Sequence, residues 1–467
     1  MRLSTAITSA CFLLLGQNTI AEGAKSSKGF LQTWTIPDGV PVAASFDVKA
    51  RVPGGRWEKI VIYQLLLNEV NFTTGGSIKH NSSLNYFDFH GTVEIQAKYL
   101  KDRVSKAIIR PYSLHLTPKK SGSVITFTLD EPRDIIVQVN YDIFDVLHIF
   151  PIPPDTNVPS DEDKEVLYYG PGYHKLNSTL EVGSGKTLYI VGGAVISAPD
   201  ITVTNSTDEA IRGRGPKGNS LQVYRSNNVL IERLVGINSL PRTYESKDVT
   251  FSHWRDFSAV QWGDGMDVYC CKNVLIDSVL RNSDDCIAVY AHRDEWHGNS
   301  TSITIQNSIL WADVAYQINI GTHGNTEDPE TIAGLTIRNI DNLDQREGQV
   351  DYQGTIALNP GNANLIQDFL IDDVRVEDIR GGQLLNFRVM YNTKYNTSPG
   401  RGIKDVLVRD LKYTGTKASM SIFVGYDEDR AISNVTFENL VINGKVISDS
   451  MQKPGWYLTA DFIPAYA

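Results

Sequence analysis

The chain has 467 residues, a formal net charge of −10 at pH 7 and a hydrophobic content of 41%. This length supports one large solenoid or a solenoid with a smaller second domain. The negative charge disfavours nucleic acids and anionic membranes as partners, because long-range repulsion opposes their approach, but it does not disfavour a polysaccharide.

Residues 1–24 have the pattern of a secretory signal peptide. Arg2 precedes an apolar run near Cys11 to Leu15, and small residues follow. No later stretch approaches the roughly 20 apolar residues of a spanning helix. Sequons for N-glycosylation begin at Asn71, Asn81, Asn177, Asn205, Asn299, Asn396 and Asn434. We therefore expect a secreted, extracellular glycoprotein that acts as a monomer.

Residues 25–150 contain short alternating runs such as Ser123–Leu129 and Ile135–Val139, separated by Gly, Pro and Asp. This pattern predicts an N-terminal antiparallel β-sandwich. Residues 151–165 concentrate proline and acidic side chains, which stiffen a chain and oppose its burial. We expect a linker there.

Residues 166–467 repeat one phrase, in which a polar residue is followed by an alternating apolar triplet. Its copies lie near Val229, Val249, Val274, Ile303, Leu335, Phe369, Val406 and Val435. The irregular spacing excludes leucine-rich repeats and propeller blades, but it suits coils with loops of varying length. The fold class predicted is all-β, with a right-handed parallel β-helix, a solenoid, after the sandwich.

Three aspartates lie one coil apart in this solenoid. Asp264 precedes Asp284 by 20 residues and Asp285 by 21. Adjacent coils are about 4.8 Å apart, so these carboxylates would share one patch of surface. Like charges that close raise one pKa, which keeps a carboxylic acid protonated for general acid catalysis. Strict alternation would place Asp284 and Asp285 on opposite faces, so both serve only if the strand ends or bends between them. Turn-capping aspartates are the alternative reading.

The segments GDGMDV and NSDDCIAV resemble the N-T-D-x-x-D and D-D-C segments of glycoside hydrolase family 28, the polygalacturonases. Family 49, the dextranases and isopullulanases, is similar in its β-helix and aspartate triad and adds an N-terminal β-sandwich. By this resemblance Asp284 is the general acid, while Asp264 and Asp285 position and deprotonate a water. It implies hydrolysis of a polysaccharide with inversion.

The sequence departs from the family 28 pattern at two places. Tyr316 stands where the G-H-G-x-S-I-G segment has its histidine, and His323 is a second candidate for that role. The R-I-K segment that binds a galacturonate carboxylate has no counterpart, since Thr336–Asn339 offers one cation. A neutral glycan such as dextran or another α-glucan is therefore the favoured substrate.

Four tryptophans fall near the aspartates, and sugar rings stack on exposed aromatic faces. Trp262 and Trp296 are the expected platforms, Trp254 and Trp311 are the others, and we expect at least one of the four to be a core residue. The expected substrate-binding residues are Trp262, Asp267, Trp296, Tyr316 and His323.

No cofactor and no metal are expected, because the histidines lack the spacing of a paired ligand motif. Cys270 or Cys271 could pair with Cys286, or all three could be small buried residues.

Three other functions stay open: a pectin-type hydrolase, a polysaccharide lyase with an arginine base (Arg281, Arg293 or Arg338) and usually Ca²⁺, and a non-catalytic carbohydrate-binding solenoid. The inverting mechanism is also expected on geometric grounds, because carboxylates from two stacked coils can leave the roughly 6.5 to 9.5 Å gap that admits a water.

Overall fold

A computed structural model describes residues 29–71, 74–348 and 354–448. The predicted signal peptide, residues 1–24, lies outside them. In the described part, regular structure consists of β-strands and one short 3₁₀ turn at Tyr112–Leu114. No helix in that part has the length and apolar character that a bilayer crossing requires.

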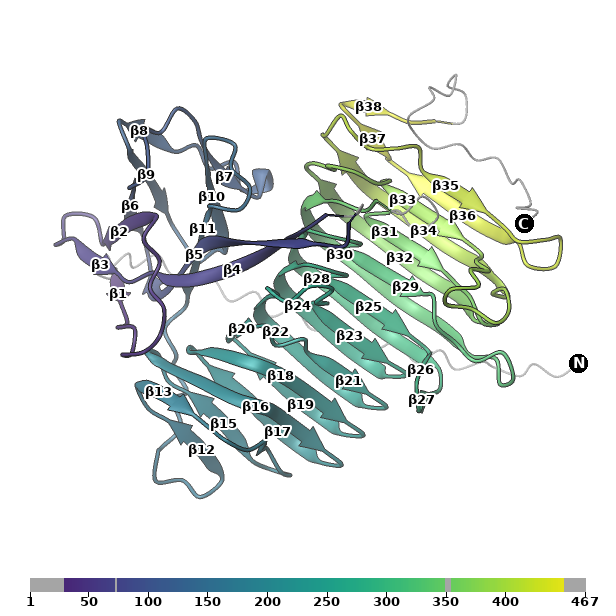
Figure 1. The fold of residues 1–467 in the computed structure, drawn as a ribbon, viewed down its shortest axis with the longest axis horizontal. Coiled ribbons are helices and arrows are strands. Elements are labelled where there is room, and N and C mark those ends of the chain that lie inside the picture. Colours follow the sequence, from purple (N-terminus) through teal and green to yellow (C-terminus); the bar gives the residue numbers. More distant parts are fainter. Residues whose placement is uncertain (1–28, 72–73, 349–353, 449–467) are drawn as a thin grey trace, which may run out of the picture.

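The N-terminal strands form two sheets that pack face to face (Figure 1). The six-stranded sheet contains β1 (Phe30–Gln32), β5 (Ser77–His90), β11 (Leu147–Ile152), β10 (Ile135–Val139), β7 (Ala107–Arg110) and β4 (Tyr63–Val70). The five-stranded sheet contains β3 (Glu58–Ile60), β2 (Phe46–Arg51), β6 (Val93–Tyr99), β9 (Val124–Leu129) and β8 (Lys119–Ser121). One pair, β5 with β11, is parallel, so the six-stranded sheet is not purely antiparallel.

The chain then enters a solenoid whose strands pair in parallel with those one coil away. β11 ends at Ile152 and β12 begins at Val166, so residues 153–165 connect the two parts. The first strands are β12 (Val166–Tyr169), β13 (Gly172–Lys175), β14 (Leu180–Glu181), β15 (Thr187–Ile190), β16 (Ala194–Thr204), β17 (Thr207–Gly213), β18 (Pro216–Tyr224) and β20 (Val235–Ile237). The predicted fold class, an all-β chain with a parallel β-helix, is confirmed.

The repeated phrase forms one row of long strands, stacked coil upon coil. These are β19 (Asn227–Glu232), β22 (Lys247–Phe257), β24 (Lys272–Asn282), β28 (Ser300–Ala312), β30 (Thr331–Gln345), β32 (Leu365–Val376), β34 (Gly402–Tyr413) and β36 (Ile432–Glu438). A second row consists of β21 (Arg242–Tyr244), β23 (Met266–Tyr269), β25 (Ile287–Tyr290), β29 (Ile318–Gly321), β31 (Ile356–Asn359), β33 (Leu385–Arg388) and β35 (Ile422–Val424). Short pieces complete the set: β26 (His292–Arg293), β27 (Trp296–His297), β37 (Val441–Ile442) and β38 (Lys445–Val446).

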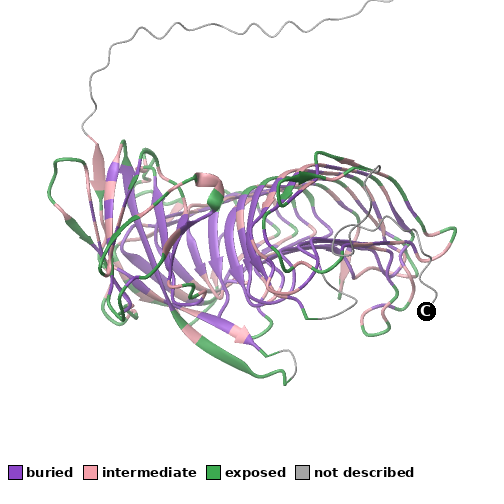
Figure 2. Cartoon of the chain, turned by 90° about the horizontal axis from the view of Figure 1, so that it is seen from above, coloured by how far each residue is buried: buried purple, intermediate pink, exposed green. Residues whose placement is uncertain are grey.

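Alternate residues of each phrase point into one continuous core. Ile231, Phe251, Ile276, Ile305 and Ile337 are stacked partners in successive coils, and all are fully buried. The residues between them face outward, as period-two alternation requires. Figure 2 shows that buried strands run through both the sandwich and the solenoid.

The polar residue that opens each phrase has a backbone role. Asn228, Asn273 and Asn434 adopt positive φ values of 58°, 56° and 51°. Asparagine tolerates this left-handed conformation better than most residues. The Asn434 amide donates to Asp405 one coil earlier at 2.6 Å, and Asn228 donates to Asp208 at the same distance. These contacts hold the turns of neighbouring coils in register.

The three cysteines Cys270, Cys271 and Cys286 are buried free thiols. They therefore form no disulfide, and Cys271 and Cys286 belong to the solenoid core. Among the sequon asparagines, Asn396 is 5% exposed, and its amide donates to the carbonyl oxygen of Thr322 at 2.6 Å. The other sequon asparagines are exposed, so Asn396 is the one that this structure disfavours as a glycan acceptor.

The sandwich and the solenoid share a buried interface. Tyr63, Leu65 and Leu84 pack against Phe257 and Val279. Buried ion pairs cross the same interface, among them Arg214 with Asp88, where the Arg214 Nε lies 3.1 and 3.0 Å from the two carboxylate oxygens. Both side chains are at least 96% buried, at 2% and 4% exposure.

Replacement of Arg214 by alanine should lower the free energy of unfolding by about 3–5 kcal/mol, because it leaves the Asp88 carboxylate buried without its cation. Urea unfolding followed by fluorescence measures the change. Replacement of Arg225, whose pair with Glu245 is half-exposed at 53% and 22%, is the control and should cost about 1 kcal/mol or less. Equal losses in the two variants would show that the Arg214–Asp88 pair does not stabilise the interface.

Candidate active site

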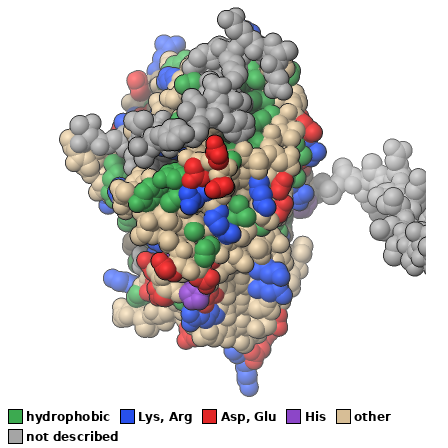
Figure 3. Space-filling model, turned by 90° about the vertical axis from the view of Figure 1, so that its right-hand side faces the viewer, with side chains coloured by type: hydrophobic (Ala, Val, Ile, Leu, Met, Phe, Trp, Pro, Cys, Tyr) green, Lys and Arg blue, Asp and Glu red, His purple; other side chains and the backbone are tan. Residues whose placement is uncertain are grey.

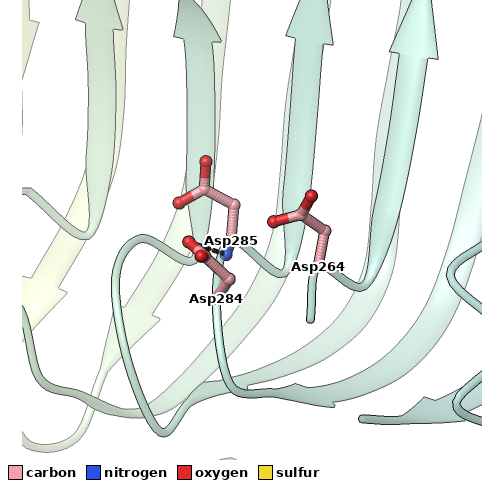
Figure 4. Close-up of side chains that lie close together, drawn as sticks. All are labelled: Asp264, Asp284 and Asp285. Carbon is pink, nitrogen blue, oxygen red and sulfur yellow. Dashed lines mark hydrogen bonds between the residues drawn. The ribbon is translucent and has the colours of Figure 1, made fainter. Parts of the chain in front are cut away.

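The three aspartates lie in turns between strands of the two rows, where period-two alternation does not apply. Asp264 lies between β22 and β23, and Asp284 and Asp285 lie between β24 and β25. Because β24 ends at Asn282 and β25 begins at Ile287, both carboxyls of the Asp-Asp pair can turn toward Asp264. Figure 4 shows the three side chains gathered on one side of the backbone.

Inter-coil hydrogen bonds continue through these turns and fix the aspartates in one column. Met266 pairs with Ile287, and Ile287 pairs with Ile318. Counting two residues back along each strand places Asp264, Asp285 and Tyr316 at stacked positions. The N–H of Gly265 donates to the Asp285 carbonyl at 2.7 Å, and the N–H of Cys286 donates to the Tyr316 carbonyl at 2.9 Å.

Asp264, Asp284 and Asp285 each contribute one carboxyl oxygen to a set of three, and these three oxygens lie within 4.8 Å of one another. Burial raises the pKa of Asp264 and of Asp284 well above the usual value, and the neighbouring carboxylates raise both further. Burial likewise raises the pKa of Asp285, to about 7. The cluster therefore retains protons at pH values where isolated aspartates are fully ionised.

Hydrogen bonds distinguish the two members of the Asp-Asp pair. Asp285 accepts from the Tyr316 N–H at 3.1 Å and from the Asn319 amide at 2.8 Å. Both contacts favour the ionised carboxylate and oppose the effect of burial on the Asp285 pKa. Asp284 accepts one bond, at 3.0 Å from the N–H of Asp285. Asp285 is thus the more readily ionised carboxyl of the pair, although burial still raises its pKa above the usual value.

The cluster is compact, because the turn after β24 brings Asp284 and Asp285 to the side of Asp264. One carboxyl oxygen of each aspartate lies within 4.8 Å of one oxygen of each of the others. This oxygen-to-oxygen distance differs from the separation between carboxyl groups, so the gap of roughly 6.5 to 9.5 Å that admits a water stays a prediction.

Two adjoining cavities meet at the aspartates. One, of about 210 Å³, is lined by all three and by Arg242, Tyr290, Arg293, Asn319, His323, Glu347 and Tyr395 among others. The second, of about 570 Å³, is lined by Trp262, Asp284, Val314, Ala315, Glu347, Gly348, Lys394 and Tyr395. Asp284 lines both cavities, so it stands where a ligand that filled both would cross from one to the other.

Tyr316 and His323 line the smaller cavity, as expected of substrate-binding residues. His323 lies against Arg293, whose guanidinium contacts its Nε2, and burial together with this cation lowers the His323 pKa to about 3. The imidazole is therefore neutral at ordinary pH. Asp267 is 1% exposed and is not among the lining residues, because it accepts from the Nε of Arg242 at 3.0 Å and from the Tyr269 hydroxyl at 2.7 Å.

The four tryptophans near the aspartates differ in exposure. Trp262 is 51% exposed and lines the larger cavity, whereas Trp254 and Trp311 are core residues. Trp296 is half-buried and lies over two tyrosines, with ring centroids 4.8 Å from Tyr244 and 5.5 Å from Tyr224. Trp262 therefore has a free face for a sugar, while one face of Trp296 covers the tyrosines.

A tyrosine ladder, which sequence reasoning missed, runs along the second row of strands toward the cavity. Tyr224, Tyr244, Tyr269 and Tyr290 stack with ring centroids 4.9, 4.7 and 5.6 Å apart. Each occupies the same register position in its coil. A tyrosine therefore recurs once per coil, and this recurrence in the sequence could have predicted the ladder.

The cations near the aspartates differ from those expected. Arg281, one of the candidate bases of a lyase, is 1% exposed, donates to Asp313 at 2.9 and 3.0 Å and lies over Trp311, so it is a buried, paired cation. Arg338 donates to Gln306 on the exposed surface of the long strands. Of the expected cations, Arg293 lines the aspartate cavity. Figure 3 shows acidic and basic side chains interspersed on the face that lies at the right-hand side of Figure 1.

Sequence reasoning missed several residues of the two cavities: Arg242, Asn319, Glu347 and Tyr395. They come from four different coils, and the loops between those coils differ in length. Of these four residues, Arg242 is the one whose position could have been inferred, because it occupies the same register position as Asp267 one coil later.

Of three comparisons with known proteins, the one with solved structures places the fold. No family model matches the chain, and no curated protein sequence matches it. Among solved structures, Dex49A from Penicillium minioluteum is 12% identical, with a TM-score of 0.57 over 90% of this chain and 92% of that one. An exopolygalacturonase from Thermotoga maritima is 15% identical, with a TM-score of 0.48 over 60% and 85%. The likeness to Dex49A confirms the β-helix fold that the resemblance to families 28 and 49 implied.

Replacement of Asp285 by asparagine should stabilise the chain at pH 8 by about 1–3 kcal/mol and much less at pH 4. The raised pKa means that the folded chain holds this proton up to about pH 7, whereas the unfolded chain releases it near the ordinary value. Stability is therefore lost as the pH rises between these values, and the amide avoids that loss. Thermal unfolding at both pH values measures it. Asp47→Asn on the exposed face of β2 is the control, and equal effects of the two variants would contradict the prediction.

Proposed function

We propose that this chain is a secreted polysaccharide hydrolase that cleaves glycosidic bonds with Asp264, Asp284 and Asp285. The observation that carries the proposal is the cluster of three carboxyls with raised pKa values at the junction of two cavities. General acid catalysis at a glycosidic oxygen needs a carboxylic acid that is still protonated, and activation of water needs a carboxylate nearby. The likeness in fold to Dex49A, a family 49 dextranase, supports the same reading.

In the proposed mechanism, Asp284 donates its proton to the glycosidic oxygen as the bond from that oxygen to the anomeric carbon breaks. Asp285, which two hydrogen bonds favour as an anion, accepts a proton from water, and the resulting hydroxyl forms a bond to the anomeric carbon. Asp264 holds the same water from the adjacent coil. After product release, transfer of the proton from Asp285 to Asp284 restores the starting state.

The favoured substrate is a neutral glycan such as dextran or another α-glucan. Of the cations beside the aspartates, Arg242 is already paired with Asp267, and Arg293 contacts the neutral His323. Trp262 offers an exposed ring beside Asp284 for stacking against a sugar. A uronate in each subsite would require charge-assisted hydrogen bonds from cations that these contacts do not already engage.

A pectin-type substrate is the second candidate, and one observation favours it. Arg242, Arg293 and Lys394 all line the cavities, so three cations surround the junction at which Asp284 lies. Arginine is well suited to recognise a carboxylate through two parallel bonds. If Arg293 left His323 in the complex, it could bind a uronate.

The proposal predicts release of reducing sugar from a panel of dextran, pullulan, polygalacturonate, rhamnogalacturonan and arabinogalactan, with the highest kcat/KM on one of the neutral α-glucans. Asp284→Asn should lower kcat by a factor of roughly 10² or more while the chain remains folded, because it removes the proton donor. Asp264→Asn and Asp285→Asn should be nearly as damaging, and non-additive with each other.

Four outcomes would overturn parts of this proposal. No sugar release from any glycan would refute the hydrolase, and near-normal turnover of Asp284→Asn would remove it as the acid. An unsaturated product whose formation requires Ca²⁺ would indicate a lyase, in which the three carboxylates bind the ion. A kcat/KM on polygalacturonate well above that on dextran or pullulan would establish the pectin-type substrate.

We further expect inversion at the anomeric carbon, as families 28 and 49 imply. In this proposal Asp264 and Asp285 share the attacking water while the third carboxyl, Asp284, is the acid. Proton NMR of the first-formed product decides the outcome. Retention would identify one of these aspartates as a nucleophile.

A further inference from the structure

One element of the N-terminal sheets reaches the segments that line the two cavities. Strands β4 and β5 form a long antiparallel hairpin, in register from Tyr63 with Leu84 to Val70 with Ser77. The hairpin extends from the sandwich across the solenoid (Figure 1). Its base is fixed by apolar contacts to the solenoid and by the Tyr86 hydroxyl, which accepts from the N–H of Gly193 at 2.9 Å.

The far end of this hairpin contacts three segments that each carry a cavity-lining residue. Val70 packs in one buried cluster with Val314, Ala315 and Tyr316. The side-chain amide of Gln261, the residue before Trp262, donates to the carbonyl oxygen of Gly75. The segments that the hairpin contacts therefore supply lining residues of the cavities, namely Ala315, Tyr316 and Trp262.

The third contact is an ion pair. The Oε1 of Glu69 lies 3.5 Å from the Nη1 of Arg346, and the Oε2 of Glu69 lies 2.8 Å from the Nε2 of His80 on the opposite strand of the hairpin. Arg346 precedes Glu347, which is 4% exposed and lines both cavities. The carbonyl of Arg346 also accepts from the N–H of Ala315 at 3.0 Å. The ion pair thus connects the hairpin to the segment that contains Glu347 and, through the Arg346 carbonyl, to the segment that contains Ala315 and Tyr316.

We propose that the end of the β4–β5 hairpin is a working part of the catalytic groove, and that Glu69 and Arg346 are positioning residues that hold Tyr316 and Glu347 beside the aspartates. This inference rests on the proposed function. Tyr316 presents its N–H to Asp285 at 3.1 Å, so a shift of that segment moves the donor that favours the anionic Asp285. Glu347 is the acidic neighbour on the other side, and its charge acts on the pKa of Asp285.

The ion pair itself contributes little to the stability of the fold. Its side chains are 32% and 34% exposed, and pairs with that exposure are screened by solvent. Removal of Arg346 should therefore affect the placement of groups in the cavity rather than folding. The chain offers a matched control, because Arg51 and Glu94 form a pair of similar exposure, 31% and 35%, on the five-stranded sheet.

The test compares Arg346→Gln, Glu69→Gln, their double variant, Arg346→Lys and the control Glu94→Gln on the polysaccharide that the wild-type chain hydrolyses best. Arg346→Gln should lower kcat/KM by roughly three- to tenfold, mainly through kcat, with an unchanged unfolding midpoint. The kcat/KM of the double variant should be no lower than that of the worse single variant, because both changes break the same contact between Glu69 and Arg346. Arg346→Lys should stay within about twofold of wild type, since it keeps the charge, and Glu94→Gln should match wild type.

Hydrogen exchange provides a readout that does not need substrate. In Arg346→Gln, the amide of Tyr316 should exchange faster than in wild type, whereas Glu94→Gln should leave it unchanged. Wild-type kcat/KM in Arg346→Gln, or fully additive losses in the double variant, would overturn the inference. If the wild-type chain releases no sugar, the proposed function fails, and the exchange rate alone decides: faster exchange at Tyr316 supports the positioning role and an unchanged rate overturns it.

Discussion

Hydrogen bonds between successive coils set the position of nearly every functional group in this chain. Parallel neighbours repeat at about 4.8 Å, so residues at equal register form columns along the solenoid. One column consists of core residues such as Ile231, Phe251 and Ile276, and another contains the stacked tyrosines. The column of Asp264, Asp285 and Tyr316 obeys the same rule, so carboxyls from separate coils converge without any local sequence motif that joins them.

Convergence of carboxyls has an energetic cost that the surrounding structure offsets. Three neighbouring carboxylates repel one another, and their raised pKa values express that repulsion together with desolvation. The hydrogen bonds from Tyr316 and Asn319 reduce the cost for Asp285 alone. An arrangement of this kind gives chemically identical side chains different protonation states, which is what acid and base roles at one site require.

The N-terminal sheets take part in this arrangement in two ways. Their apolar contacts and the buried Arg214–Asp88 pair fix them on the solenoid, while the β4–β5 hairpin reaches the back of the cavity wall. A parallel β-helix leaves its turns exposed, and turns of irregular length are the least constrained part of the coil. The β4–β5 hairpin contacts the turns of Tyr316 and Glu347 through Val70 and Glu69, and in our proposal these contacts hold the two turns in place.

The amino-acid sequence was sufficient to predict the solenoid, because the repeated phrase reflects period-two burial in each coil. It was also sufficient to predict that Asp264 lies close to Asp284 and Asp285, because their spacing equals one coil. It did not predict that Asp284 and Asp285 face the same side, since this depends on where β24 ends. Nor did it predict the burial of Asp267 and Arg281, or the approach of Arg242, Glu347 and Tyr395 to the cavity. Those positions depend on loop lengths and on contacts between residues far apart in the chain, such as Glu69 with Arg346. The order of residues along the chain does not give the distances between such residues in space.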